Sequence, residues 1–313
     1  MKALFTYDYG QENMEDIKNL GYDIMIVKEN EAVYQEAMKD VEVLVCYNPF
    51  STLDVKKMTG LRWIQLSSIG VDQAPMDTLI DQNVILTNNK GGYSIPMGEW
   101  VVLKMLEIYK KTRELYQQQD KKQWRMNTSL LELYGKKVTF IGTGSIAQES
   151  AKRLQGFGVE VLGINTRGTD TEYFHKCYPI EQMKEILEIS DVVVVTVPYT
   201  DKTHHMLNRN RLMAMKKNAV LINVSRGSII DEAALIQVLS EGHLMGIALD
   251  VFEEEPLSSE SPLWEMENVL VSPHNSWISE MRNERRFQMI LENMKRYINK
   301  EKLLNVVDLQ KGY

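Results

Sequence analysis

The chain has 313 residues, 44% of them hydrophobic and 25% charged, with a formal net charge of −7. At roughly 150 residues per domain, this length predicts two domains, each with its own hydrophobic core. Because the balance is acidic and no basic block stands out, a nucleic-acid partner is not expected. No apolar stretch approaches the roughly 18 residues that a membrane helix needs, so no membrane partner is expected either.

The amino-terminal residues and the cysteines indicate a cytoplasmic protein without a metal site. The first residues, MKALFTYDYGQE, soon turn acidic and lack the apolar core of a signal peptide. Cys46 and Cys177 do not have the spacing of metal ligands, and Cys46 lies in an apolar run that is typical of a buried side chain.

In the first part of the chain, short apolar runs alternate with amphipathic segments. Strands are expected at residues 3–6, 23–27, 41–46, 63–66 and 84–87. The helical patterns between them include residues 13–20 and 32–38. This alternation predicts a parallel sheet that is covered by helices on both faces.

A long helical pattern covers residues 97–119, and a polar stretch at residues 117–123 overlaps its end. Trp124 follows, and then the pair Leu130 and Leu131. The polar stretch can be a solvated surface connection, or it can form a contact between subunits together with its apolar neighbours. The residues themselves favour neither interpretation.

A second alternating series begins at Lys137. Its expected strands are residues 137–141, 159–164, 191–197, 219–224, 246–251 and 269–272. The run DVVVVTV has no polar alternation, as expected for a central strand that is buried on both faces. Further helices are expected at residues 231–242, between an Asp start signal and a terminal glycine, and at residues 279–299.

A glycine-rich loop connects the first strand of this series to a helix that runs through Arg153. It reads Gly142, Thr143, Gly144, Ser145, Ile146, Ala147, which is G-x-G-x-x-A. In this pattern Gly142 permits the tight turn, Gly144 lets the backbone approach a pyrophosphate, and Ala147 lets the helix pack closely on the strand. The phosphates would lie at the helix N-terminus, where free N–H groups and the helix dipole attract anions. A purely structural turn is the alternative, but the position between strand and helix favours a dinucleotide site.

The end of the next strand bears on the cofactor. A site that prefers NAD usually has an acid here, about 20 residues after the glycines, but this chain has Asn165, Thr166 and Arg167. A carboxylate would repel a 2′-phosphate, whereas Thr and Arg can bind one, so we expect NADP to be preferred and NAD to be possible. Two alternatives stay open: Arg167 can be a solvated loop residue, and Asp170 can bind the ribose after a loop shift.

Two residues at strand ends of the second series fit hydride transfer to a 2-oxo acid. Arg226 follows a strand, and its planar fork can bind a carboxylate through two hydrogen bonds. A surface ion pair is the ordinary alternative for a lone arginine. Among the histidines only His274 directly follows a strand, so it is the candidate acid/base. His204 and His205 are adjacent and would not share a face of a helix or strand.

An acidic run, Glu253, Glu254 and Glu255, also follows a strand end. A carboxylate that pairs with a histidine raises the pKa of that histidine and fixes the orientation of its ring. For any single glutamate of the run, a solvated loop position is the ordinary alternative. The residues alone do not select among the three.

With these features in place, the sequence resembles the D-isomer-specific 2-hydroxyacid dehydrogenase family over nearly its whole length. The segments that carry the resemblance are SSIGVD, GTGSIA, INVSRGSIIDEAAL, GIALDVFEEEPL and SPHNSW. The resemblance implies that Arg226, Glu255 and His274 are the catalytic residues, since the family's glutamate directly precedes a proline.

The resemblance also implies the fold and further site residues. The fold would be α/β with two doubly wound parallel-sheet domains: a Rossmann dinucleotide domain (residues 96–276) inserted into a flavodoxin-like substrate domain (residues 1–95 and 277–313). The substrate carboxylate would be bound at Ser68, by the amides of Ile69 and Gly70. The cofactor would contact Thr143, Gly144, Ser145 and Ile146 with its pyrophosphate, Val197, Pro198 and Thr203 with its adenosine, and Val224, Arg226, Asp250, His274 and Ser276 with its nicotinamide.

The function implied is hydride transfer between NAD(P)(H) and a small D-2-hydroxy acid or 2-oxo acid of the glyoxylate, hydroxypyruvate or phosphoglycerate type. Family members are usually dimers with contacts in the region of residues 97–133, so a homodimer is expected. Trp277 occupies a position that is often glycine in this family, so it is expected to narrow the substrate pocket. A dinucleotide-sensing regulatory protein on the same fold is the alternative, and the intact Arg–Glu–His set argues against it.

Overall fold

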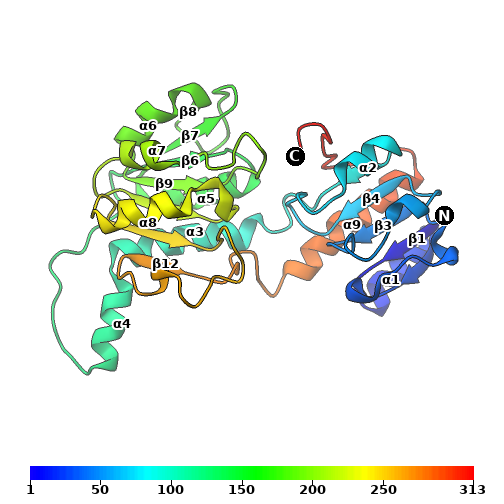
Figure 1. The fold of residues 1–313 in the computed structure, drawn as a ribbon, viewed down its shortest axis with the longest axis horizontal. Helices are drawn as coiled ribbons and strands as arrows, with labels where there is room; N and C mark the ends of the chain where they lie inside the picture. Colours follow the sequence, from blue (N-terminus) through cyan, green and yellow to red (C-terminus); the bar gives the residue numbers. More distant parts are fainter. The chain divides into compact units, whose positions relative to one another are not determined.

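The computed structural model describes residues 1–313, and these divide into two compact units (Figure 1). Unit 1 is formed by Met1–Tyr93 together with Ser279–Tyr313, and unit 2 by Ser94–Ile278. Each unit is built around its own parallel sheet. None of the helices combines the length and the apolar composition that crossing a bilayer requires.

The sheet of unit 1 has five parallel strands in the order β2-β1-β3-β4-β5, which is the flavodoxin-like order of doubly wound folds. The strands are β1 (Lys2–Phe5), β2 (Asp23–Ile26), β3 (Val43–Cys46), β4 (Trp63–Leu66) and β5 (Ile85–Thr87). The helices of this unit are α1 (Gln11–Asn19), α2 (Met76–Asp81) and α9 (Arg282–Ile298).

Helices α1 and α9 cover one face of this sheet. Ile17 of α1 and Phe287 and Ile290 of α9 pack with Phe5 and Trp63 of the strands, and all five side chains are fully buried. The end of the chain then returns to the edge strand, because Val307 N donates to the carbonyl of Leu86. A helix close to the carboxyl end of the chain thus completes a core that the first strands begin.

The predicted helix at residues 32–38 is wrong. The structure has only a 3-10 turn at Glu36–Met38, preceded by extended chain. Ala32 and Met38 are both fully buried in the same core. Positions six residues apart lie about 120° apart around an α-helix, so a helix would turn one of the two away from the core.

The sheet of unit 2 has seven parallel strands in the order β12-β11-β10-β9-β6-β7-β8. Read from β8, this is the Rossmann order 3-2-1-4-5-6 with one strand added. The strands are β6 (Lys137–Ile141), β7 (Glu160–Asn165), β8 (Lys176–Pro179), β9 (Val192–Val195), β10 (Val220–Asn223), β11 (Gly246–Leu249) and β12 (Val269–Val271). The helices are α3 (Ser94–Tyr109), α4 (Thr112–Asp120), α5 (Ser145–Leu154), α6 (Met183–Ile189), α7 (Arg209–Ala214) and α8 (Glu232–Ser240). The predicted α/β class with two doubly wound parallel sheets is therefore confirmed.

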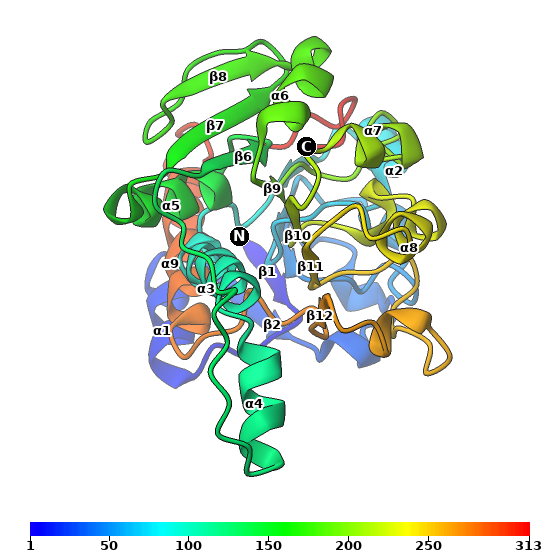
Figure 2. The same ribbon diagram turned by 90° about the vertical axis from the view of Figure 1, so that its left-hand side faces the viewer.

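Two predictions in unit 2 need correction. The second series contains seven strands rather than six, because the short edge strand β8 was not foreseen. The helix expected at residues 97–119 is two helices, α3 and α4, separated at Lys111, whose φ of 50° is left-handed and interrupts the helix. Figure 2 shows α4 and the loop after it extending away from the sheet of this unit. The loop carries Trp124, which is fully exposed, and Met126.

Short 3-10 turns complete the secondary structure. Besides the turn described above they are Glu29–Glu31, Val55–Lys57, Gln155–Phe157, Ile180–Gln182, Gly227–Ile229 and Pro262–Trp264.

Candidate active site

The glycine-rich loop lies between β6 and α5 and has the geometry of an anion-binding turn. Gly142 has a φ of 94°, and a Cβ there would lie 2.9 Å from a methyl group of Val197, so only glycine fits. A Cβ on Gly144 would meet nothing within 4 Å, so the space above this residue is open to a ligand. Gly144 caps α5 without a side-chain hydrogen bond, which leaves the N–H groups of the first turn available. Ala147 is fully buried, as close packing of α5 requires.

Asn165, at the end of β7, organises the neighbouring turn. Its Oδ1 accepts hydrogen bonds from the amides of Arg167 (3.2 Å) and Thr169 (3.1 Å). Its Nδ2 donates to Thr143 Oγ1 (3.2 Å) and to the Thr169 carbonyl (2.8 Å). The side chain at the position of the usual ribose-binding acid is therefore neutral and connects this turn to the glycine-rich loop.

The two charged residues of this turn lie in different surroundings. Asp170 Oδ1 accepts a hydrogen bond from the amide of Cys177 in β8 (3.1 Å), so its carboxylate is engaged with the edge strand. Arg167 is exposed, and its side chain makes no hydrogen bond or ion pair within the chain. The guanidinium of Arg167 is thus available to a ligand, whereas the carboxylate of Asp170 is hydrogen-bonded within the chain.

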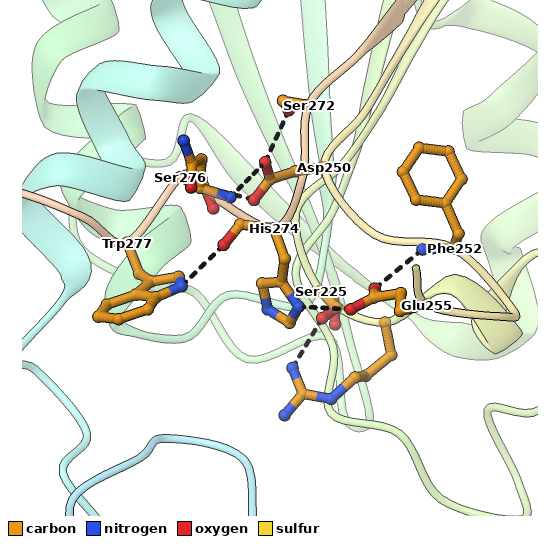
Figure 3. A network of polar contacts seen from close by, with 10 residues as sticks. Ser225, Asp250, Phe252, Glu255, Ser272, His274, Ser276 and Trp277 are labelled. Atoms are coloured by element: carbon orange, nitrogen blue, oxygen red, sulfur yellow. Dashed lines mark hydrogen bonds and ion pairs between the residues drawn. The ribbon is translucent and has the colours of Figure 1, made fainter. Parts of the chain in front are cut away.

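Glu255 and His274 are joined by a hydrogen bond of 2.9 Å between Glu255 Oε2 and His274 Nδ1 (Figure 3). The other carboxylate oxygen, Oε1, accepts from the amide of Phe252 at 3.1 Å. With Nδ1 donating to the carboxylate, the ring nitrogen that remains for proton exchange is Nε2, which makes no hydrogen bond within the chain. Each of the two side chains is 38% exposed.

The pKa of Glu255 is lowered from its ordinary value. Burial opposes ionisation of this carboxyl group, but the hydrogen bonds from His274 and from the amide of Phe252 outweigh it. The charges of His274 and Arg226 act in the same direction. Glu255 is therefore held as a carboxylate, which is the form that orients and stabilises a protonated imidazole.

Asp250 builds the loop that carries His274. Its carboxylate is buried and accepts hydrogen bonds from Ser272 Oγ (2.6 Å) and from the amides of Asn275 (2.8 Å) and Ser276 (2.9 Å). These bonds support the left-handed backbone of His274, whose φ is 51°. Figure 3 shows the Asp250 carboxylate beside the backbone of this loop and the indole of Trp277 on the other side of it. Trp277 Nε1 donates to the carbonyl of His274 at 2.8 Å.

Arg226 follows β10, and close backbone packing brings its loop to Glu255. A Cβ on Gly227 would lie only 1.8 Å from the carbonyl carbon of Phe252, so the two loops are in direct contact and residue 227 must be glycine. The carbonyl of Arg226 accepts a hydrogen bond from Asn223 Nδ2 (2.9 Å), and its guanidinium donates to the carbonyl of Ser225 (2.8 Å). The structure thus brings together the arginine, the glutamate and the histidine that the sequence indicates.

Glu253, two residues before Glu255, belongs to a second histidine–glutamate pair. Glu253 Oε1 contacts His205 Nε2 at 2.7 Å, and the ring of His205 stacks on that of His204 with centroids 3.9 Å apart. The expectation that these two histidines share no face assumed regular backbone, but His205 has a left-handed φ of 47°. The structure thus pairs Glu253 with His205 and Glu255 with His274. No group of three or more His, Cys, Asp or Glu side chains is arranged to hold a metal ion.

The loop after β9 carries Val197, Pro198 and Thr203. Thr203 Oγ1 donates to the Pro198 carbonyl (2.8 Å) and accepts from the amide of Thr200 (2.7 Å), so it closes the loop on itself. Ser225 Oγ donates to the carbonyl of Val197, which ties this loop to the residues after β10. Val224 is buried.

In unit 1, Ser68, Ile69 and Gly70 form the turn after β4. Ser68 Oγ donates to the carbonyl of Gly70 (2.8 Å), and Asn88 Nδ2 donates to that of Ile69 (2.8 Å). The amides of Ile69 and Gly70 make no hydrogen bond within the chain. The carbonyl groups of the turn are thus bonded while its N–H groups are left for an acceptor, which is the arrangement of an anion-binding turn.

Comparison with known proteins fits this geometry. The family model described as "D-isomer specific 2-hydroxyacid dehydrogenase, NAD binding domain" matches residues 102–276. The chain belongs to this family. Among its relatives, the chain is 33% identical over 246 residues to a glyoxylate reductase of Thermofilum pendens, covering 76% of this chain and 72% of that one.

Two further relatives of this dehydrogenase family are informative. The chain is 31% identical over 278 residues to D-3-phosphoglycerate dehydrogenase of Methanocaldococcus jannaschii; this covers 88% of the chain but spans only about half (53%) of that enzyme. A crystal structure of a D-isomer specific 2-hydroxyacid dehydrogenase from Xanthobacter autotrophicus Py2, in complex with NADPH and MES, superimposes with a TM-score of 0.85 at 28% identity. The match covers 100% of this chain and 99% of that one.

Sequence reasoning missed two residues that act through the backbone. Asn88 orients the turn at Ile69, and Asn223 orients Arg226. Both are polar residues at or just after the end of a buried strand. That position is the one signal in the sequence that could have indicated them.

Proposed function

We propose that this chain catalyses hydride transfer between NADP(H) and a small D-2-hydroxy acid or 2-oxo acid, acting chiefly as a reductase of the 2-oxo acid. The hydrogen bond between Glu255 and His274, beside the loop of Arg226, is the observation that carries the proposal. A histidine held by a carboxylate at one nitrogen and available at the other is equipped to donate a proton to a developing alkoxide. The family and the names of the relatives support the same reaction class.

The catalytic residues have distinct roles in this proposal. Arg226 binds the substrate carboxylate and polarises the carbonyl group. His274 donates its proton from Nε2 to the carbonyl oxygen, while Glu255 keeps the imidazole oriented through Nδ1. The amides of Ile69 and Gly70 bind the substrate carboxylate. When bound, the nicotinamide supplies the hydride.

The cofactor would be held by residues whose geometry fits it. The backbone from Thr143 to Ile146 would bind the pyrophosphate at the N-terminus of α5. The adenosine would lie along Val197, Pro198 and Thr203, and the nicotinamide along Val224 and Ser276. The buried hydroxyl of Ser276 has no hydrogen-bond partner in the chain, so a polar group of a ligand could pair with it. We assign Asp250 to the support of the His274 loop.

NADPH is proposed as the preferred cofactor because of the charges at the end of β7. Arg167 is exposed and without a partner, Asn165 is neutral, and Asp170 is bonded to the amide of Cys177. A 2′-phosphate would therefore meet a cation and no competing carboxylate. The related Xanthobacter structure contains NADPH, which supports the same choice.

The proposal is tested by turnover. Purified protein is assayed with glyoxylate, hydroxypyruvate and phosphohydroxypyruvate, each with NADPH and with NADH, by the absorbance of the reduced nicotinamide. We expect reduction of at least one acid by the wild-type protein and loss of that activity in Arg226→Ala. Absence of turnover with every acid and both cofactors, in protein that binds NADPH, would contradict the proposed reaction.

We further propose that the protein is cytoplasmic and that it acts as a homodimer. The second point rests on the apolar side chains of α4 and its loop, among which Tyr116, Trp124, Met126 and Tyr134 are more than half exposed. Aromatic and methionine side chains gathered on one projecting segment are typical of an interface.

A further inference from the structure

A cluster of cations in unit 1 takes no part in the chemistry described so far. The first five residues of α9 read RNERR and include Arg282, Arg285 and Arg286. Cations are disfavoured at a helix N-terminus, because the helix dipole already places positive charge there. Glu284, which lies among these arginines in α9, accepts a hydrogen bond from Gln288. Neither Arg285 nor Arg286 makes a salt bridge with any carboxylate of the chain.

Arg286 is held in place by aromatic rings rather than by an acid. Its guanidinium carbon lies 4.8 Å from the ring centroid of Tyr7 and 5.2 Å from that of Tyr9. One terminal nitrogen donates to Asn283 Oδ1 at 2.9 Å, while the Nε atom is buried without a hydrogen-bond partner. The guanidinium is thus oriented and partly desolvated, and its charge is not neutralised by the chain.

The position of Arg286 is at the ligand-binding edge of the sheet in unit 1. Tyr7 and Tyr9 follow β1, and β1 and β3 are the neighbours where the strand order 2-1-3-4-5 reverses. In doubly wound sheets, ligands bind outside the carboxyl ends of the strands at this point. The cation therefore lies where this fold accepts ligands.

Hydrogen bonds connect Arg286 to the turn whose amides are free. Asn89 is fully buried; its side chain donates to the carbonyl of Arg286 (3.1 Å), and its amide donates to the carbonyl of Ser68 (2.8 Å). Tyr93 makes a second connection, because its hydroxyl donates to the carbonyl of Ser67. Burial raises the pKa of Tyr93, and the charges of Arg286 and Arg282 oppose that rise, so these groups lie close together.

We propose that Arg286 is a specificity-determining residue that binds a second anionic group, a carboxylate or a phosphate, at the distal end of the substrate. The inference rests on the proposed function, because the turn of Ile69 and Gly70 would hold the 2-carboxylate of the same molecule. A cation beside that turn favours substrates with two anionic ends over those with one. The preferred class is then a 2-oxo dicarboxylic acid or a phosphorylated 2-oxo acid.

The kinetic test compares acids with one and with two anionic groups. Oxaloacetate and phosphohydroxypyruvate, which separate the carboxylate from the phosphate source, are compared with pyruvate in the wild-type protein, Arg286→Met and Arg286→Lys. Arg296→Gln is the matched control, since Arg296 lies on the same helix and pairs with Glu292 at 2.6 Å. We expect the wild-type kcat/KM for one dianionic acid to exceed that for pyruvate, and Arg286→Met to reduce this ratio about 10- to 100-fold, chiefly through KM. Arg286→Lys should restore part of the ratio, because it keeps the charge.

A binding experiment separates this inference from the proposed reaction. D-malate and D-lactate, with two and one carboxylates, are titrated by calorimetry into the wild-type protein and Arg286→Met. Weaker binding of D-malate alone in the variant supports the anion subsite even if no acid is reduced, in which case only the proposed reaction fails. Equal binding of D-malate to both proteins, or loss of kcat/KM by the same factor for all three 2-oxo acids, would overturn the assignment and leave Arg286 as a support for the tyrosines.

Discussion

The imidazole of His274 is bonded at Nδ1 to Glu255 and has Nε2 free within the chain. Replacing the ring with alanine removes the proposed proton donor and leaves the glycine-rich loop unchanged. We predict that His274→Ala lowers kcat by about 10²–10⁴-fold. NADPH binding, measured by fluorescence titration, should stay close to that of the wild-type protein. An unchanged kcat in a folded variant would exclude His274 as the acid.

The lowered pKa of Glu255 gives the pH dependence a definite sign. The interaction of its carboxylate with a protonated imidazole is present above the ordinary pKa range of Glu and is lost as the pH falls through the lowered value. Glu255→Gln replaces the carboxylate with a neutral amide that does not titrate. We predict that the kcat/KM of the wild-type protein falls as the pH drops through the lowered pKa of Glu255, and that the variant lacks this acid limb. A pH profile of kcat/KM that matches the wild-type profile would remove Glu255 from this role.

Arg167 is the residue that should set the choice of cofactor. One charge-assisted bond to a 2′-phosphate is worth roughly 1.5–3 kcal/mol, which corresponds to a preference of about tenfold or more. We therefore predict that the wild-type protein has a higher kcat/KM with NADPH than with NADH, and that Arg167→Ala reduces the ratio about tenfold while changing the NADH value little. A wild-type preference for NADH, or an unaltered ratio in the variant, would show that Arg167 stays in solvent.

Asp191 links the starts of neighbouring strands in unit 2. Its carboxylate accepts from the amide of Lys137 (2.9 Å) at the start of β6 and pairs with Lys216 (2.7 Å) before β10. Burial opposes ionisation of this group, but the bonds from Lys216 and Lys137 outweigh it and lower its pKa. Asp191→Asn should therefore destabilise the fold by about 1 kcal/mol near neutral pH, since the pair is partly exposed.

The sign of the pH dependence follows from the lowered pKa. The stabilisation by Asp191 is present above the ordinary Asp range and disappears as the pH falls through the lowered value, so wild type and Asp191→Asn should converge in acid. Urea unfolding at several pH values measures the difference. Glu160→Gln is the control, because Glu160 makes an exposed pair with Lys137 at 3.0 Å and should matter little. A difference that persists unchanged into acid would contradict the assignment.

Some elements could be predicted from the sequence because their residue pattern is compatible with only one kind of secondary structure. The four valines of β9 are buried on both faces, and an apolar run of that length forms a central strand. In β8, by contrast, only Cys177 is buried, so a short edge strand carries almost no pattern. The break at Lys111 was hidden as well, because lysine is a good helix former and its left-handed backbone depends on tertiary packing.

In the candidate site, too, some residues could be predicted from the sequence and others could not. Arg226 and His274 follow buried strands, and strand ends are visible in a sequence. The choice of Glu255 over Glu253 depends on the left-handed backbone at His205 and His274, which directs each ring to a different carboxylate. Arg286 lies on a helix near the end of the chain, and its relation to Tyr7 exists only in the folded unit.

The projecting segment of α4 and its loop is the place to test association of two copies of the chain. Trp124 is fully exposed, so replacing it does not disturb a core. We predict that the wild-type protein sediments as a dimer and that Trp124→Glu shifts it toward monomer at the same concentration, because a charge in an apolar interface is costly. Val33→Glu, at an exposed position of unit 1, is the control. A wild-type monomer, or a Trp124→Glu dimer of unchanged stability, would contradict the proposed interface.

The dependence of the first sheet on α9 affects how the protein is made. During synthesis, β1 to β5 emerge from the ribosome first. The helix that supplies Phe287 and Ile290 to their core emerges only after all of unit 2. Unit 2 is continuous in sequence and can fold while unit 1 still exposes Phe5 and Trp63 to solvent. During that interval the ribosome-bound chain presents an uncovered apolar sheet face, the kind of surface that chaperones bind and that leads to aggregation.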